Sequence, residues 1–424
     1  MTMRPPMFRS FFLGGFECST HRRADGRRLD LLAATGHDRR AAEDYRQAAE
    51  HGIRTIRDGI RWHLIEVRPG EYDWSSVLPM LRAAEAAGTE VIWDLCHYGW
   101  PDHLDIWSAG FVEAFAAYAA AFARLHREET GRPPLICPVN EIAFLAWAGG
   151  DVAIMNPCAH GRGDDLKRQL VRAALAGGAA VRAAVPGSRI FAIDPLIHIV
   201  PRPHADPDLA RHFSAQQYEG WDMLTGRREP ELGGSPDAID AIGVNFYWNN
   251  QWLFPDAARP PDAGPDWRPS RDALSPYDPR WRPFRAMLAE VHARYGRPLF
   301  VAETSIEAAA RPDWLRHVCE EVRAAMAAGV PVGGICLYPV LSHPGWDDDR
   351  YCPNGLFEMA TEGRRRVVDA PLAAELARQQ ALFGPATAAP VRLGTGFQVA
   401  TASVPAHHRP GLQRGGRAAT LDIG

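Results

Sequence analysis

Short apolar runs that end in polar residues recur along the whole chain, and helix-like segments separate them. Each run has the length of a strand, and a parallel strand that is buried on both faces reads as such a run. The pattern predicts eight strands, over Phe11–Phe16, Ile53–Trp62, Val91–Cys96, Leu135–Ile142, Arg189–Ile193, Ala238–Val244, Pro298–Ala302 and Val332–Val340.

The segments between these runs repeat apolar residues at the spacing of one helical face, as at positions 111, 115, 118, 122 and 125. Helices are predicted over Ala41–Glu50, Ser75–Ala87, Phe111–Arg127, Leu166–Ala184, Phe284–Tyr295, Trp314–Ala328 and Pro371–Leu382. Eight strands that mostly precede a helix indicate an α/β protein with a single (β/α)8 TIM barrel, whose active site lies at the carboxyl ends of the strands. A doubly wound sheet is the alternative, but it normally has fewer strands and a glycine-rich first turn, and Gly14-Gly15 lack that spacing.

Composition divides the chain into two parts. Residues 1–384 carry the strand and helix pattern, and we expect them to form one catalytic domain. Residues 385–424 are rich in Pro, Ala, Thr, Gly and Arg without periodicity, which predicts a disordered, low-complexity tail. Residues 253–283 are rich in Pro, Asp and Arg, and we expect a long functional loop there.

Charge narrows the choice of partners. The net charge is -4 and the isoelectric point about 6.5, which favours neither nucleic acid nor an acidic membrane surface as a partner.

The apolar patch Phe11–Phe16 is too short for a signal peptide or a membrane span, so we expect a cytoplasmic protein. The seven scattered cysteines form neither a disulfide framework nor a zinc pattern. We expect no metal and no organic cofactor, and the oligomeric state stays open.

Polar residues close most of the predicted strands. In a barrel they meet at one rim, and the candidate site residues are Glu17, Arg57, His97, Asn140, Glu141, Asn245, Tyr247 and Glu303. Two glutamates that face each other across a pocket are what cleavage of a glycosidic bond requires. Arg57 would keep one carboxylate ionised and Tyr247 would add a hydrogen bond, whereas burial would raise the pKa of the other.

Each candidate also has a structural interpretation. A single glutamate at a strand end is most often solvated, Arg57 could form an ion pair with Asp58 or Glu90, and His97 could be a core histidine. The sequence leaves open whether Trp100, Trp248 and Trp346 pack in the core or form a platform for a sugar ring.

Five motifs carry a resemblance to a known family: Gly52–Trp62, Leu95–Tyr98 with Pro101, Phe115–Ala119 followed by Val139–Glu141, Gly243–Tyr247 and Phe300–Glu303. In their order they resemble the motifs of glycoside hydrolase family 1, the retaining (β/α)8 β-glucosidases and β-galactosidases. The resemblance implies that Glu303 is the nucleophile and Glu141 the acid/base. It also implies that Arg57 and Tyr247 support Glu303, that His97 and Asn140 bind sugar hydroxyls, and that Glu17 is an approximate counterpart of a sugar-binding glutamine.

The sequence departs from the family at several places. Ile142 stands where the family has proline, and Thr304-Ser305 stand where it has Asn-Gly. On strand eight the Trp-Ser and Glu-Trp elements are replaced by Leu337–Pro339 and Pro344–Trp346, of which Trp346 is a candidate for substrate binding. The resemblance therefore indicates a divergent relative and does not identify the sugar.

Together these observations predict a retaining glycoside hydrolase that cleaves a β-linked glycoside by double displacement. The two carboxyl groups should lie about 5 to 5.5 Å apart, as retention requires. The same fold leaves two other functions open. The protein could bind or sense a carbohydrate without catalysis, or it could be a transglycosylase.

Overall fold

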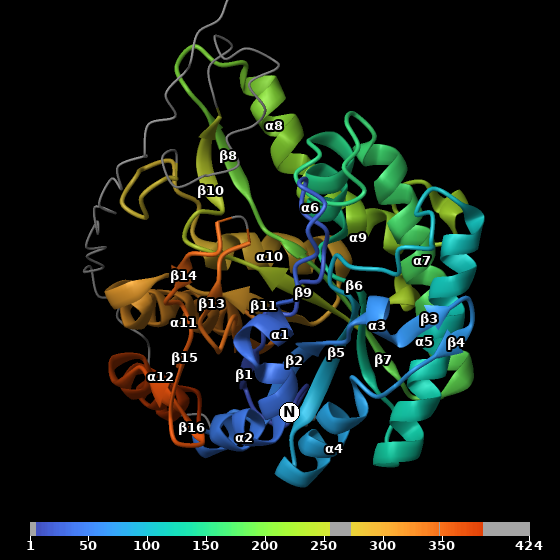
Figure 1. Cartoon of the computed structure of the whole chain (residues 1–424). Coiled ribbons are helices and arrows are strands. Elements are labelled where there is room, and N and C mark those ends of the chain that lie inside the picture. The colour runs from blue at the N-terminus through green and yellow to red at the C-terminus, as the bar shows by residue number, and fades with distance from the viewer. Residues whose placement is uncertain (1–5, 255–272, 347, 385–424) are drawn as a thin grey trace, which may run out of the picture.

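Eight parallel strands close a barrel, which Figure 1 shows at the centre of the molecule. The structure, a computed structural model, describes residues 6–254, 273–346 and 348–384. The strands are β1 Phe12–Gly15, β2 Thr55–Gly59, β5 Glu90–Cys96, β6 Leu135–Val139, β7 Arg189–Pro195, β9 Ala241–Asn245, β11 Leu299–Thr304 and β12 Val332–Leu337. They stand around the barrel in chain order, and β12 pairs with β1 to close it. The predicted (β/α)8 barrel is therefore confirmed.

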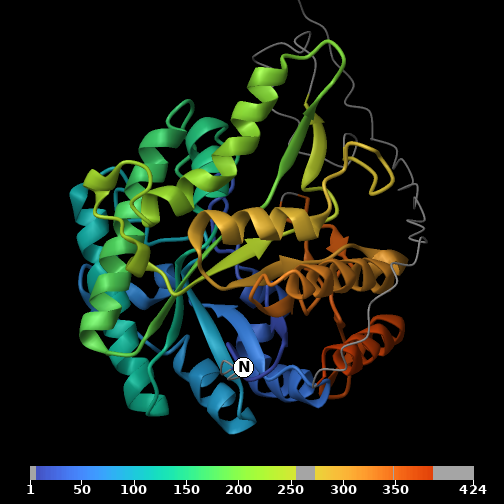
Figure 2. The same cartoon turned by 180° about the vertical axis from the view of Figure 1, so that it is seen from behind.

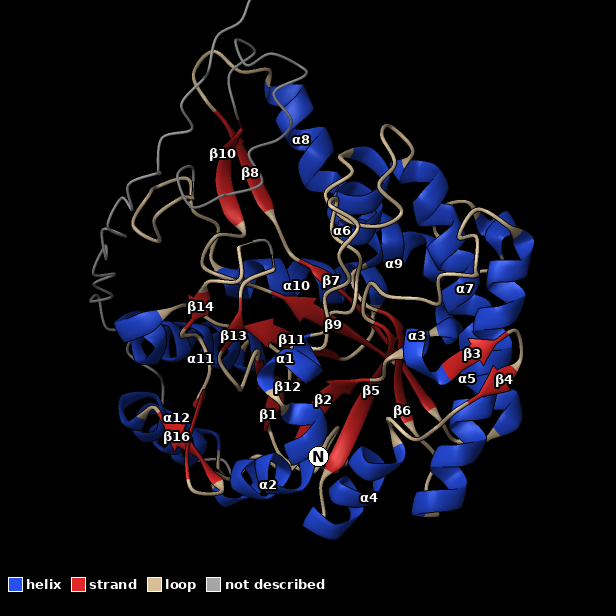
Figure 3. Cartoon of the chain, viewed as in Figure 1, coloured by secondary structure: helices blue, strands red, loops and turns tan. Residues whose placement is uncertain are grey.

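Helices surround the barrel, as the blue ribbons outside the red strands of Figure 3 show. They are α2 His37–Glu50, α4 Leu78–Ala87, α5 Ala109–Thr130, α7 Gly163–Ala184, α10 Phe284–Tyr295, α11 Arg311–Ala327 and α12 Ala370–Phe383, with the shorter α1 Leu31–Thr35, α3 Trp62–Ile65, α6 Ile142–Leu145, α8 Pro207–Ala215 and α9 Glu219–Leu224. Each of the seven predicted helices is present. In the described residues no helix is long and apolar enough to cross a membrane.

Several predicted strands extend further in the sequence than they do in the structure, for example Leu135–Ile142, in which β6 ends at Val139. The run Ile53–Trp62 contains β2 only from Thr55 to Gly59, because Trp62 already begins α3. The run Val332–Val340 ends as a strand at Leu337, where the chain turns into the loop that follows β12. The middle of the predicted loop, 255–272, and the predicted tail, 385–424, lie outside the described residues.

The barrel interior is filled at the amino-terminal ends of the strands. Phe8 packs there against Phe191 and Phe300, with ring centroids 5.7 and 5.2 Å apart. Leu13, Cys137 and these three phenylalanines belong to one buried apolar cluster inside the barrel. Because this end is closed by side chains, polar groups gather at the opposite, carboxyl-terminal end.

Small pairs of strands add to the barrel. The parallel pair β8 His198–Pro201 and β10 Gln251–Phe254 projects beyond the barrel together with α8, as Figures 1 and 2 both show. After β12, the pair β13 His343–Pro344 and β14 Tyr351–Cys352 forms an antiparallel hairpin. The remaining pairs are β3 Glu66–Arg68 with β4 Glu71–Tyr72, and β15 Phe357–Glu362 with β16 Arg365–Val368.

A buried histidine joins the first long helix to the barrel. The side chain of His37 lies between two carboxylates, with Nδ1 2.9 Å from Asp44 Oδ2 and Nε2 2.9 Å from Asp58 Oδ2. Its ring stacks on Phe16 with centroids 3.5 Å apart. Burial opposes the charged form, but Asp58 and Asp44 outweigh it and raise the pKa of His37 to about 9. The charged imidazole thus ties α2 to β2.

We predict that this histidine makes stability depend on pH. Because its folded pKa is raised, the contribution is fully present below the unfolded pKa of about 6.5 and is lost as the pH rises through about 9. At pH 6.5, His37→Gln should lower the free energy of unfolding by roughly 3–5 kcal/mol, the cost of breaking a buried ion pair. Urea unfolding at pH 6.5 and 9.5 measures both effects.

The matched control is His126→Gln, because His126 is also buried but its pKa is lowered to about 4 by burial, so it stays neutral over this range. The control should keep the wild-type loss of stability between the two pH values. If His37→Gln loses as much stability as the wild type between pH 6.5 and 9.5, the imidazole of His37 is not the charged group that makes stability depend on pH.

Candidate active site

A single arginine joins four strands at the carboxyl-terminal end of the barrel. The fully buried guanidinium of Arg57, on β2, donates to Asp94 on β5 from Nε at 3.2 Å and from Nη2 at 2.7 Å. It also donates to Glu303 on β11 and to Asn140, which follows β6. Burial opposes its charge, but Asp94 and Glu303 raise the pKa of Arg57 well above its usual value. Its partners are therefore not Asp58 or Glu90, the two that the structural interpretation had suggested.

Glu303 receives a hydrogen bond on each carboxylate oxygen. Arg57 Nη1 donates to Oε1, and the hydroxyl of Tyr247 donates to Oε2 at 2.6 Å. A cationic donor and a phenolic donor both stabilise a carboxylate in its ionised form. The side chain is only 5% exposed, so water contributes little to this stabilisation.

Glu141 has the opposite surroundings. Its oxygens accept hydrogen bonds from Asn245 Nδ2, at 2.7 Å, and from the hydroxyl of Tyr98, both of which are neutral donors. Burial and the negative charge of Glu303 raise the pKa of Glu141 to about 8, although the two hydrogen bonds and Arg57 act in the other direction. The surroundings of Glu141 therefore favour its protonated form, and of the two glutamates only Glu303 bonds directly to the guanidinium of Arg57.

Asn140 connects the two glutamates. Its Oδ1 accepts from Arg57, which binds Glu303, and its Nδ2 donates at 2.9 Å to the hydroxyl of Tyr98, which binds Glu141. Nδ2 also lies 3.1 Å from His97 Nε2, and His97 Nδ1 lies 2.9 Å from Asp94 Oδ2. One continuous network therefore includes both carboxyl groups.

Glu17 and Trp346 lie on another side of this network. Glu17 follows β1, and its Oε1 is 3.9 Å from His97 Nε2. Burial opposes ionisation of Glu17, but His97 and His343 outweigh it and hold its pKa below the usual value. Trp346 comes from the loop between β13 and β14, and its ring centroid is 5.6 Å from that of Tyr98. The structure thus brings together all nine residues that the sequence suggested.

Sequence reasoning missed two residues of the site. Asp94 lies inside the apolar run Val91–Cys96, where an isolated aspartate was the available signal. Tyr98 belongs to a motif that the sequence analysis used, but nothing local shows that its hydroxyl reaches Glu141. Trp100, by contrast, packs on Phe111 of α5 with centroids 5.8 Å apart, which supports its packing interpretation.

One polar atom of the site has no hydrogen-bond partner among the residues that the structure describes. Asn245 is fully buried, and while its Nδ2 donates to Glu141, its Oδ1 is unpaired. Buried polar atoms are rarely left unpaired, so this oxygen is suited to accept a hydrogen bond from a ligand.

Cys18, Asp94 and His97 have the side-chain types of a metal site, and their ligand atoms lie within 4.8 Å of one another. However, Asp94 Oδ2 already accepts from Arg57 at 2.7 Å and lies 2.9 Å from His97 Nδ1. A guanidinium at this distance repels a cation, and burial raises the pKa of the Cys18 thiol well above its usual value. The cluster therefore fits a hydrogen-bond network better than a metal site.

The chain matches no protein-family model, and no curated protein matches its sequence. Solved structures do match. A β-glycosidase from the hyperthermophile Thermosphaera aggregans is 16% identical, with a TM-score of 0.68, over 89% of this chain and 97% of that one. A family 1 β-glucosidase from Thermotoga maritima is 14% identical, with a TM-score of 0.66, over 88% and 98%. The AHE enzyme from Alicyclobacillus herbarius is 17% identical, with a TM-score of 0.69, over 89% and 100%.

At these identities the similarity establishes the fold. The matches cover 88–89% of the chain and include a family 1 β-glucosidase, so the resemblance predicted from the motifs is confirmed at the level of the fold.

We predict that Glu303→Gln lowers the pKa of Glu141 from about 8. The substitution removes the negative charge of Glu303, which acts strongly on Glu141 because little water lies between the two buried groups to screen it. Carbon NMR of protein with labelled glutamate side chains follows this titration, and Glu141→Gln identifies the signal.

Glu321→Gln is the matched control, since Glu321 is equally buried but pairs with Arg285 outside the site. It should leave the Glu141 titration unchanged. An identical Glu141 pKa in Glu303→Gln would show that the two carboxyl groups are not electrostatically coupled.

Proposed function

We propose that the protein is a retaining glycoside hydrolase that acts on a β-linked glycoside. The observation that carries this proposal is the difference between the two buried carboxyl groups. Glu303 accepts hydrogen bonds from the cationic Arg57 and from Tyr247, whereas Glu141 lies among neutral donors and its pKa is raised by burial and by the charge of Glu303. A nucleophile and a proton donor are the two groups that this reaction needs. The shared fold supports the same function.

In the first step a carboxylate oxygen of Glu303 attacks the anomeric carbon of the sugar and forms a glycosyl ester. The bond between that carbon and the leaving oxygen breaks, and the proton of Glu141 passes to the leaving oxygen. In the second step Glu141, now ionised, takes a proton from water while the water oxygen attacks the same carbon. The ester bond breaks, and Glu303 is again a free carboxylate.

The electrostatic link between the two glutamates suits this sequence. When Glu303 becomes an ester it loses the negative charge that helps to raise the pKa of Glu141. The pKa of Glu141 then falls, so the residue changes from an acid in the first step to a base in the second.

The surrounding residues have distinct roles in this proposal. Arg57 and Tyr247 hold and orient Glu303, and Asn140 couples that pair to Glu141 through Tyr98. Asn245 orients Glu141 and offers its unpaired Oδ1 to the substrate. His97 and Glu17 contact sugar hydroxyls, and Trp346 provides an apolar face beside them.

We also infer a reducing compartment such as the cytoplasm. All seven cysteines lie in the described part of the chain and none forms a disulfide, which is typical of proteins kept under reducing conditions.

We predict different kinetic effects for the two glutamates. Glu303→Gln should lower kcat by at least about 10³-fold on every glycoside, because the nucleophile is lost. Glu141→Gln should lower kcat/KM by about 10²–10⁴-fold on alkyl glycosides, which need protonation, and far less on 2,4-dinitrophenyl glycosides, whose leaving group needs none. Rates on both substrate types measure this difference, with Glu321→Gln as the control at the wild-type rate.

Four results would contradict the proposal. Wild-type turnover by Glu303→Gln would exclude Glu303 as the nucleophile. Sugar binding by a wild-type protein that cleaves no glycoside would favour the non-catalytic function, and longer glycosides formed with an added acceptor would favour glycosyl transfer. A separation of the two carboxyl groups well beyond about 5.5 Å would exclude the two-step mechanism.

A further inference from the structure

A buried aspartate lies directly behind the turn that carries Glu141. Asp194 is at the carboxyl end of β7, next to β6, and is 1% exposed. Its Oδ1 accepts a hydrogen bond from the backbone N–H of Ala143 at 2.9 Å, and the backbone of Phe144 also bonds to this carboxyl group. Both residues belong to α6, which begins immediately after Glu141.

The start of α6 lacks the cap that a helix normally has. The residue at that position usually accepts a hydrogen bond from the first free N–H groups with its own side chain. Here that residue is Glu141, whose carboxyl group instead binds Asn245 and Tyr98 and makes no cap bond. The free N–H groups of α6 therefore need an acceptor from elsewhere, and Asp194 supplies it.

The backbone of Glu141 is itself in an unusual conformation. Its φ of 44° and ψ of 63° lie in the left-handed region, which a residue with a side chain adopts only when its surroundings hold it there. The N–H of Glu141 donates to the carbonyl of Ile193 at 3.0 Å, so β7 holds the turn at Glu141 and, through Asp194, at Ala143.

We propose that Asp194 is a positioning residue for acid/base catalysis, which caps α6 in place of Glu141 and so leaves the Glu141 carboxyl group free to face the substrate. The inference rests on the proposed function and adds to it a residue that touches neither substrate nor the reacting atoms.

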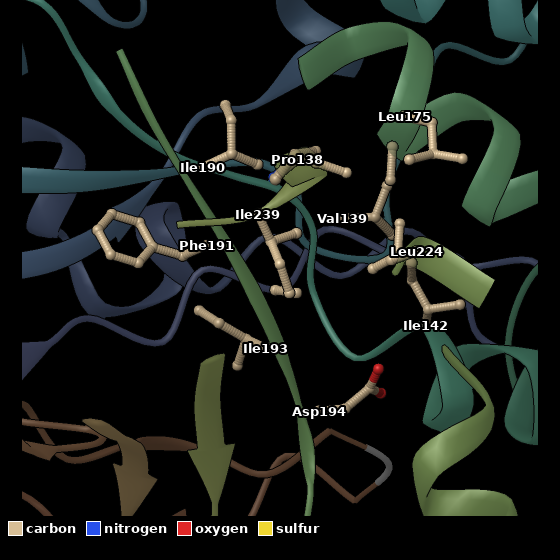
Figure 4. A pocket seen from close by; sticks show the side chains of 13 residues that line it. Pro138, Val139, Ile142, Leu175, Ile190, Phe191, Ile193, Asp194, Leu224 and Ile239 are labelled. Carbon is tan, nitrogen blue, oxygen red and sulfur yellow. The ribbon is translucent and has the colours of Figure 1, made fainter. Parts of the chain in front are cut away.

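The surroundings of Asp194 are apolar. Figure 4 shows its carboxyl group at the edge of a group of aliphatic side chains that includes Ile142, Ile193 and Leu224. Burial has the largest effect on Asp194 and raises the pKa of its carboxyl group well above the usual value, although the hydrogen bond from the backbone of Ala143 acts in the other direction. Asparagine has the same shape and keeps an accepting Oδ1, so it can cap α6 in the same way.

A glycine leaves room for this carboxyl group. A Cβ at Gly220, on α9, would lie 2.8 Å from Asp194 Oδ2 and 3.6 Å from the Cβ of Ile142. Alanine at this position would displace the carboxyl group without removing it, and this gives a second way to test the cap.

The test compares substrates whose leaving groups differ in their need for a proton. Asp194→Ala should lower kcat/KM roughly 30- to 100-fold on an alkyl glycoside, and less than about threefold on the 2,4-dinitrophenyl glycoside of the same sugar, because only acid catalysis is impaired. Asp194→Asn should stay within about threefold of the wild type on both, since its Oδ1 still accepts. Gly220→Ala should show the same difference between the two substrates as Asp194→Ala, with a smaller loss of kcat/KM on the alkyl glycoside.

The matched control is Asp240→Ala. Asp240 Oδ2 accepts from the backbone N–H of Ile190 at 2.6 Å, which is a similar bond at the opposite end of β7. Loss of this bond should change kcat/KM by the same factor on both substrates.

Equal losses on both substrates in Asp194→Ala and Gly220→Ala would overturn the inference and leave Asp194 a purely structural residue. If the wild type cleaves no glycoside, the proposed function fails first, and the carbon NMR signal of Glu141 then decides about Asp194. A Glu141 shift and titration that are unchanged in folded Asp194→Ala and Gly220→Ala would overturn the positioning role.

Discussion

The buried guanidinium of Arg57 is the interaction on which the rest of the site depends. It is the cation that Asp94 and Glu303 share, and each of these buried carboxylates would lose its bond to a guanidinium if Arg57 were absent. Because its partners come from β5, β11 and the end of β6, the same group also fixes how these strands meet β2 at the carboxyl-terminal end of the barrel. One side chain, that of Arg57, therefore determines both how these strands meet and where positive charge lies in the site.

The position of this one cation also distinguishes the two glutamates. Both are buried and both end a strand of the barrel, but only Glu303 has a direct bond to Arg57, while Glu141 has amide and phenol donors. The pKa of Glu141 thus depends on the charge of Glu303, and Glu303 is bound directly by Arg57.

The sequence was sufficient for the barrel and for most of the site, for a physical reason. Strands buried on both faces must be apolar, so a polar residue at the end of such a run is visible, as with Glu141, Glu303 and Asn245. The roles of Asp94 and Asp194 could not be predicted, because they depend on contacts with residues far along the chain, Arg57 and Ala143. Strand ends were also imprecise where the apolar pattern continues into a helix, as at Trp62.

The most direct test of the account is covalent trapping by a panel of 2-deoxy-2-fluoro glycosides with activated leaving groups, measured as the mass of the intact protein and then of its peptides. The account predicts a mass gain of one fluorinated sugar on the peptide that contains Glu303, and no gain in Glu303→Gln. A sugar attached to another residue, or turnover of glycosides in a protein that no member of the panel labels, would contradict it.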